Sequence, residues 1–207
     1  MAAPTEKTIQ NLNGRWTMNT TLSSPFEPIL ALQGVSWLLR KALGVATITL
    51  HISEYKAPPG QGRSGGDDEG KDVVHIDIDQ TASPGNIKGT SELRTINWVP
   101  GESESYIFGH VRGRARFLTT KEIGSDEPGE ALDENEVEFL KSDWDSEEVM
   151  ESWVKNLDAN GGWTAEQIWG FADVKGERRH VRKVIIKKGK DIQRGTLIYD
   201  WVGEQAD

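Results

Sequence analysis

Cysteine is absent from the 207-residue sequence. Disulfide bonds, thiolate metal sites and a cysteine nucleophile are therefore excluded. Because a chain without disulfides suits a reducing compartment, we expect a cytoplasmic protein.

Basic residues and long apolar runs are also scarce. The 24 Lys and Arg are outnumbered by 33 Asp and Glu, which gives a net charge of −9. Nucleic acids and anionic membranes are held by an excess of Lys and Arg, so neither is expected as a partner. No stretch approaches the ~18 apolar residues of a membrane span, and residues 1–7 lack the features of a secretion signal. We expect a soluble protein without membrane insertion, and the sequence carries no signal of its oligomeric state.

Common catalytic motifs are missing as well. The sequence has no Gly-x-Ser-x-Gly elbow, P-loop, His-Glu-x-x-His or dinucleotide fingerprint, so hydrolases, kinases, zinc proteases and dehydrogenases have no support. The four histidines fall on different predicted strands without ligand spacing: His51, His75, His110 and His180. We therefore expect neither a metal nor another cofactor.

Alternation of apolar and polar residues, the period of a half-buried strand, recurs along most of the chain. Residues 25–43 instead show a helical period broken at Gly34, which predicts a helix-turn-helix. Residues 146–157 fit a helix or a strand, and the turn-forming residues 158–162 favour a strand in their second half. The predicted strands are 14–20, 45–52, 73–80, 87–98, 106–118, 163–174, 177–188 and 192–202.

These elements predict a mainly β protein with a single domain over residues 1–207. About nine or ten strands without βαβ alternation should close into an antiparallel up-and-down β-barrel, because closure removes exposed sheet edges. The helix-turn-helix between the first two strands would form a short lid. Residues 58–70 and 120–138 are acidic and lack a hydrophobic period, so both are expected to be surface loops.

Several motifs resemble those of the calycin group, the lipocalins and intracellular fatty-acid-binding proteins. Gly14 and Trp16 resemble the Gly-x-Trp start, and residues 32–41 look like the second half of the helical lid. Residues 157–169 are similar to the Leu-Asp-Gly-Gly turn and Gln-x-Trp strand, and residues 195–200 to the last strand. The overall pattern also resembles uncharacterised lipocalin-like proteins of filamentous fungi. The resemblance implies a barrel that holds a hydrophobic or amphipathic small molecule.

One position departs from this resemblance. Fatty-acid-binding proteins hold the carboxylate with an Arg-x-Tyr in the last strand, and the matching pair here is Leu197 and Tyr199. The missing arginine implies that long-chain fatty acids bind no better than neutral analogues.

The candidate ligand-binding residues come from the lid, from strand 106–118 and from the late strands. A barrel that binds an amphipathic ligand needs aromatic walls and a few fixed donors inside, and we expect Tyr199 and Gln167 to be such donors. No catalytic residue is predicted. The predicted ligand-binding set is Leu30, Trp37, Tyr106, Phe108, His110, Arg112, Gln167, Trp169 and Tyr199.

Two orientations of strand 106–118 stay open. Either the row that begins with Tyr106 and Phe108 faces the interior, or the alternate row with Val111 and Ala115 does. The basic residues within 178–188 are expected on a solvated face, with one or two turned inward as anion donors. The side chains of His75, Asp77 and Asp79 share another strand face, for which the pattern favours solvent exposure over an acid/base cluster.

Two functions fit this barrel. The first, which we favour from sequence, is binding of a hydrophobic small molecule. The alternative is a cofactor-independent cyclase or isomerase of secondary metabolism, of the pericyclase type, that folds a hydrophobic biosynthetic intermediate in the same cavity. The sequence does not separate them, because confinement and hydrogen-bond polarisation use the same residue types as binding.

Overall fold

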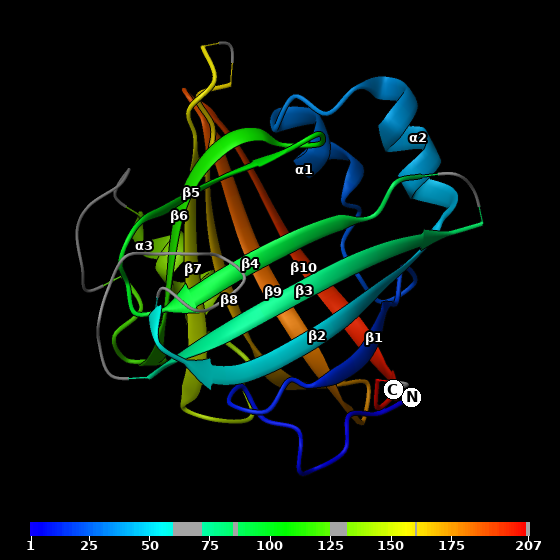
Figure 1. Cartoon of the computed structure of the whole chain (residues 1–207), viewed down its shortest axis with the longest axis vertical. Helices are drawn as coiled ribbons and strands as arrows, with labels where there is room; N and C mark the ends of the chain where they lie inside the picture. Colours follow the sequence, from blue (N-terminus) through cyan, green and yellow to red (C-terminus); the bar gives the residue numbers. More distant parts are fainter. Residues whose placement is uncertain (60–71, 85–86, 125–131, 160, 206–207) are drawn as a thin grey trace.

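The computed structural model describes residues 1–59, 72–84, 87–124, 132–159 and 161–205. In these residues, ten strands and three short helices form a barrel (Figure 1). In chain order the elements are β1 (Gly14–Met18), α1 (Glu27–Leu32), α2 (Trp37–Val45), β2 (Thr47–Ala57), β3 (Val73–Ser83), β4 (Thr90–Ile96), β5 (Gly101–Ser105), β6 (Gly109–Thr119), α3 (Glu134–Lys141), β7 (Glu148–Asn156), β8 (Thr164–Val174), β9 (Glu177–Lys188) and β10 (Asp191–Gly203).

The strands follow the order β4-β3-β2-β1-β10-β9-β8-β7-β6-β5, and all neighbours in this order are antiparallel. A parallel pairing of Ile96 in β4 with Ala115 in β6 closes the barrel, supported by the Trp98 N–H donating to the Ala115 carbonyl at 2.9 Å. Beyond this closing link, β4 pairs with β3 and β5 with β6. In the described residues, β4 and β5 are therefore not paired with each other. This arrangement confirms the predicted barrel of nine or ten strands and adds one parallel contact.

The main core lies inside one end of the barrel and is centred on Trp16. This side chain is fully buried, and its indole N–H donates to the Leu12 carbonyl at 2.9 Å. Its ring lies edge-on to Phe171 and Trp201, with centroids 5.9 and 4.7 Å away. The core therefore joins the first strand to the last two hairpins.

A second core lies on the outer face of β7, β8 and β9, beneath α3. It contains Val149, Ile168 and Ile185 from the strands and Leu140 from the helix. The predicted surface loop 120–138 thus overlaps a helix, α3, which begins with a capping box between Asp133 and Glu136. Its eight residues are too few for a helical period to stand out.

Two other sequence expectations differ from the structure in detail. Residues 106–108 form a turn because the chain reverses at Gly109, whose φ of +71° a side chain would strain. Gly44 lies inside α2 and does not end it. Most of the expected loop 58–70 lies outside the described residues.

No helix in the described part of the chain is both long and apolar enough to cross a membrane.

The helical pair lies over the other end of the barrel (Figure 1). Ile29 of α1 is buried against Val184 and Ile186 of β9. The Ser36 side chain accepts from the Leu39 N–H at the start of α2. The strand core fills one end of the barrel, so open interior remains beneath these helices.

Glu54 offers a test of the packing at the filled end. This carboxylate accepts from the Leu12 N–H at 2.9 Å, and its burial raises the pKa from 4.5 to about 7 despite that hydrogen bond. The protonated form therefore stabilises the fold fully below pH 4.5, and this contribution is lost as the pH rises through about 7. We expect Glu54→Gln to raise the free energy of unfolding by about 1–2 kcal/mol at pH 8 and by much less at pH 5.

Urea unfolding at the two pH values measures this difference. Glu104→Gln, at an exposed position of β5, is the control for removal of one carboxylate. An equal gain at both pH values for Glu54→Gln would contradict the expected coupling.

Candidate functional site

A cavity of about 670 Å³ lies inside the barrel, beneath α1. One part of its lining is apolar and comes from α1, β7, β8, β9, the turn before β6 and the residue before β8. This apolar part includes Ile29, Leu30, Phe108, Val154, Trp163, Ala165, Val184 and Ile186. Trp163 is buried, its ring meets Phe108 edge-on at 6.1 Å, and its indole Nε1 has no hydrogen-bond partner among the described residues.

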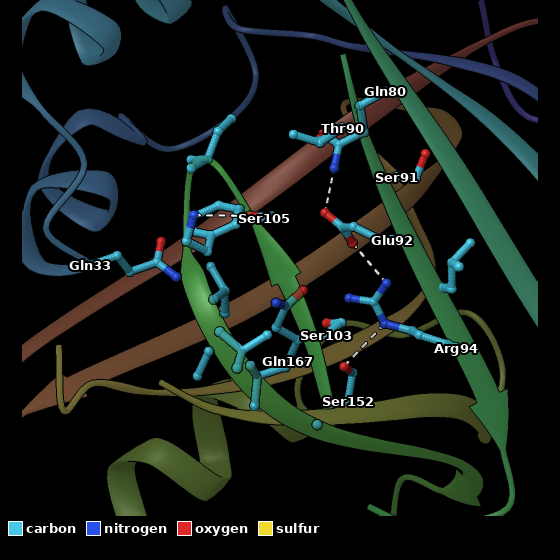
Figure 2. Close-up of a pocket in the computed structure, with 18 of the residues that line it drawn as sticks. Gln33, Gln80, Thr90, Ser91, Glu92, Arg94, Ser103, Ser105, Ser152 and Gln167 are labelled. Atoms are coloured by element: carbon cyan, nitrogen blue, oxygen red, sulfur yellow. Dashed lines mark hydrogen bonds and ion pairs between the residues drawn. The ribbon is translucent and has the colours of Figure 1, made fainter. Parts of the chain in front are cut away.

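The opposite part of the lining is polar and begins on β4. Arg94 donates from Nη1 to Glu92 at 2.7 Å and from Nε to the Ser152 hydroxyl at 3.3 Å, as Figure 2 shows. The other oxygen of Glu92 accepts from Gln80. Burial alone would raise the pKa of Glu92, but the charges of Arg94 and Arg182 and the two hydrogen bonds outweigh it and lower the pKa. Glu92 is therefore ionised, and each of its two oxygens accepts a hydrogen bond.

Arg182 of β9 is a second guanidinium at this polar end. Its carbon Cζ lies 3.6 Å from the centroid of the Trp169 ring and 5.0 Å from that of Tyr199. Trp169 is itself held by its indole N–H, which donates to Gln167 at 3.0 Å. Arg94 also lies over Trp169, at 4.6 Å. The indole is thus the common platform for both cations.

His180 lies beneath Arg182 and is fully buried. Burial and the charge of Arg182 lower its pKa to about 3, so the ring is neutral at physiological pH. Its Nδ1 lies 3.1 Å from the Gly170 carbonyl and therefore carries the proton, which leaves Nε2 to accept from Arg182 at 3.4 Å. Burial likewise raises the pKa of Tyr199, so its hydroxyl stays protonated and can donate to a ligand.

Five residues of the predicted ligand-binding set line this cavity: Leu30, Tyr106, Phe108, Gln167 and Tyr199. Trp169 lies one layer behind them, bonded to Gln167. Trp37 lies outside the cavity lining and is 63% exposed on α2.

The structure also decides the orientation of strand 106–118. Val111, Gly113 and Ala115 line the cavity, so this row faces the interior. His110 and Arg112 point outward and bind Glu102 at 2.9 and 2.5 Å. Because the turn at 106–108 breaks the alternation, Tyr106 and Phe108 still reach the cavity. We therefore leave His110 and Arg112 out of the proposed site.

Sequence reasoning missed Glu92 and Arg94, whose only signal is two charges at alternate positions of a strand. It also expected His75 and Asp77 in solvent, whereas both are buried, with Tyr55 stacked on His75 at 5.3 Å and bonded to Asp77 at 3.0 Å. No group of three or more potential metal ligands occurs among the described residues.

The closed barrel, the helical pair after its first strand and the internal cavity define a barrel of the fatty-acid-binding, calycin-like class. A single-substitution variant of the fluorescent protein UnaG has the same fold, with a TM-score of 0.51 at 13% identity, covering 94% of this chain and 98% of that one. The REP1-NXSQ fatty acid transporter gives a TM-score of 0.49 at 15% identity, over 94% of this chain and 98% of the transporter. No protein-family model matches the sequence.

Two curated relatives match over the whole chain. The probable pericyclase scpY of Mollisia scopiformis is 32% identical over 204 residues, covering 99% of this chain and 96% of that protein. Pericyclase pydY of Acremonium sp is 28% identical over 206 residues, covering the full length of both. The chain belongs to this family of fungal pericyclase-like proteins.

The cavity can be tested by filling it. Val184 is 4% exposed and lines the apolar part, so Val184→Trp should place an indole in the open space and weaken binding of the neutral dye N-phenylnaphthylamine about tenfold or more. Dye fluorescence measures binding, and circular dichroism checks that the barrel is intact.

The matched control is Val45→Trp, which adds the same ring at a position 83% exposed on α2. This variant should bind the dye like the unmodified protein. Unchanged dye binding by a folded Val184→Trp variant would show that the dye does not use this cavity.

Proposed function

We propose that this protein is a cofactor-independent pericyclase that folds a hydrophobic biosynthetic intermediate inside the barrel and promotes its cyclisation. The observation that carries the proposal is the full-length similarity to two proteins named as pericyclases, joined to an internal cavity with one apolar and one polar part. This favours the cyclase over the simple binding protein that we favoured from sequence.

A pericyclic cyclisation rearranges bonds within one substrate molecule, so the protein needs to supply a shape and a few fixed hydrogen-bond donors. Ile29, Phe108, Trp163 and Ile186 would hold the unsaturated hydrocarbon in a folded conformation with its reacting carbons close together. The entropy of ordering the flexible chain is then lost when the substrate binds, before the reaction step. In favourable cases such positioning lowers the activation barrier by up to about 7–11 kcal/mol.

The polar end would act on the electronics of the substrate. A carbonyl conjugated to one reacting double bond becomes more electron-poor when it accepts a hydrogen bond, and this lowers the barrier to cycloaddition. Tyr199 and Gln167 are the donors we assign to this oxygen, because both line the cavity: Tyr199 lies beside Arg182, and Gln167 pairs with Val184 across the sheet. The raised pKa of Tyr199 keeps its proton in place.

The activity is tested with an extract of a strain from which the gene has been deleted. Cyclisation leaves molecular mass unchanged, so we expect purified protein to convert one accumulated compound into an isomer of identical mass, resolved by liquid chromatography and mass spectrometry. Conversion should survive dialysis against a chelator, because no cofactor takes part in the proposed step. No conversion of any compound would contradict the proposal and leave a binding protein.

Tyr199→Phe tests the polarising donor. Loss of one hydrogen bond that strengthens in the transition state should lower kcat about ten- to a hundredfold while KM changes little. Tyr55→Phe removes a hydroxyl that bonds to Asp77 outside the cavity lining and should not change the rate. If Tyr199→Phe instead weakens binding and leaves kcat unchanged, Tyr199 only anchors the ligand.

A further inference from the structure

Arg182 has fewer hydrogen-bond partners than its burial requires. The residue is 4% exposed and lines the cavity. Its Nε donates to neutral His180 at 3.4 Å, and its buried Nη2 has no partner among the described residues. A guanidinium carries five N–H donors, and leaving them unpaired in a buried site is unfavourable.

The aromatic rings beside Arg182 do not replace those partners. Trp169 and Tyr199 lie 3.6 and 5.0 Å from the guanidinium carbon and favour its positive charge through their ring faces. The N–H groups point outward in the plane of the guanidinium, where bonding requires an acceptor such as an oxygen. The rings therefore hold the cation in place and leave its donors available.

The other charges of the polar end are already engaged. Glu92 acts on Arg182 at a distance, but both of its oxygens accept from Arg94 and Gln80. At the rim, Glu102 is bound to Arg112 and His110. The neighbours on β8, β9 and β10 are Gln167, Trp169, His180 and Tyr199, all neutral. A surplus positive charge therefore lies at the polar end, although the whole chain has a net charge of −9.

We propose that Arg182 binds an anionic oxygen group of the substrate, a planar anion with two oxygen atoms such as a carboxylate or the enolate of a β-dicarbonyl group. The inference rests on the proposed function and specifies the polar end of its substrate. Two parallel N–H···O bonds from the planar guanidinium fit such an anion. The substrate hydrocarbon would then extend toward Ile29 and Trp163.

The register of β9 and β10 explains how this site arises. Arg182 pairs directly across the sheet with Leu197, so both side chains lie on the inner face. The guanidinium that the last strand lacks at Leu197 is present on the neighbouring strand. This reverses the expectation, drawn from Leu197 alone, that fatty acids bind no better than neutral analogues.

Displacement of N-phenylnaphthylamine from the unmodified protein tests the anion site without turnover. Dodecanoate should displace the dye at about a ten- to hundredfold lower concentration than methyl dodecanoate, which has the same chain without the charge. A dodecanoyl cyclohexanedione and its O-methyl enol ether form the corresponding pair for an enolate. If the anion is preferred in only one pair, that pair identifies the oxygen group that the site binds. If the anion is preferred in both pairs, the site binds carboxylates and enolates alike. No preference in either pair would overturn the proposal.

Arg182→Met and Arg194→Met then test whether Arg182 is the residue that causes the preference for the anion. Arg182→Met should keep dye affinity and lose the preference, whereas Arg194→Met removes a charge from β10 toward α3 and should keep both. If Arg182→Met does not fold, Arg182→Lys retains the charge without the planar fork and should reduce the preference by about tenfold. A preference unchanged in a folded Arg182 variant would place the anion elsewhere and overturn the assignment.

These results separate the two proposals. An anion preference without isomerisation in the extract would remove the pericyclase and keep the anion site. Isomerisation without an anion preference would keep the pericyclase and remove the anion site.

Discussion

In the described parts of the chain, the barrel is closed by one short parallel pairing, between Ile96 of β4 and Ala115 of β6. Trp98 extends this link with a backbone hydrogen bond to Ala115, and its ring lies between the guanidinium groups of Arg114 and Arg116, 4.1 and 4.2 Å away. On one side of the link the strands enclose the packed core around Trp16. On the other side, β4 and β5 both line the cavity. The closing link therefore lies where both parts of the interior meet, because Ile96 packs against the core and Ala115 lines the cavity.

The cavity combines two environments because strand faces of different composition meet around it. Inner residues of β7, β8 and β9 near α1 are apolar, whereas β4 contributes Glu92 and Arg94. Trp169 lies beneath both cations and is fixed by Gln167, so the polar end is held by a side chain from the core. A substrate with a hydrocarbon part and an oxygen-bearing end would have one orientation in such a site.

The long late strands could be predicted from sequence, because alternation continues over 163–202 and the turns at 175–176 and 189–190 are marked by glycine. Short elements such as β5 and α3 could not, since five or eight residues give no clear period. In the cavity, Gln167 and Tyr199 followed from the family resemblance. Glu92 and Arg94 were missed because charged residues on a strand normally face water, and only the closure of the barrel turns them inward.

The closing link between β4 and β6 also has a mechanical meaning. Ile96 and Ala115 join β4 to β6, and beyond this pair β4 is hydrogen-bonded to β3 while β6 is hydrogen-bonded to β5 and β7. Ala115 is 2% exposed and lines the cavity, so a larger side chain at this position would have to push β4 and β6 apart or enter the cavity. The width of the cavity therefore depends on the closing link as well as on the residues of the cavity wall.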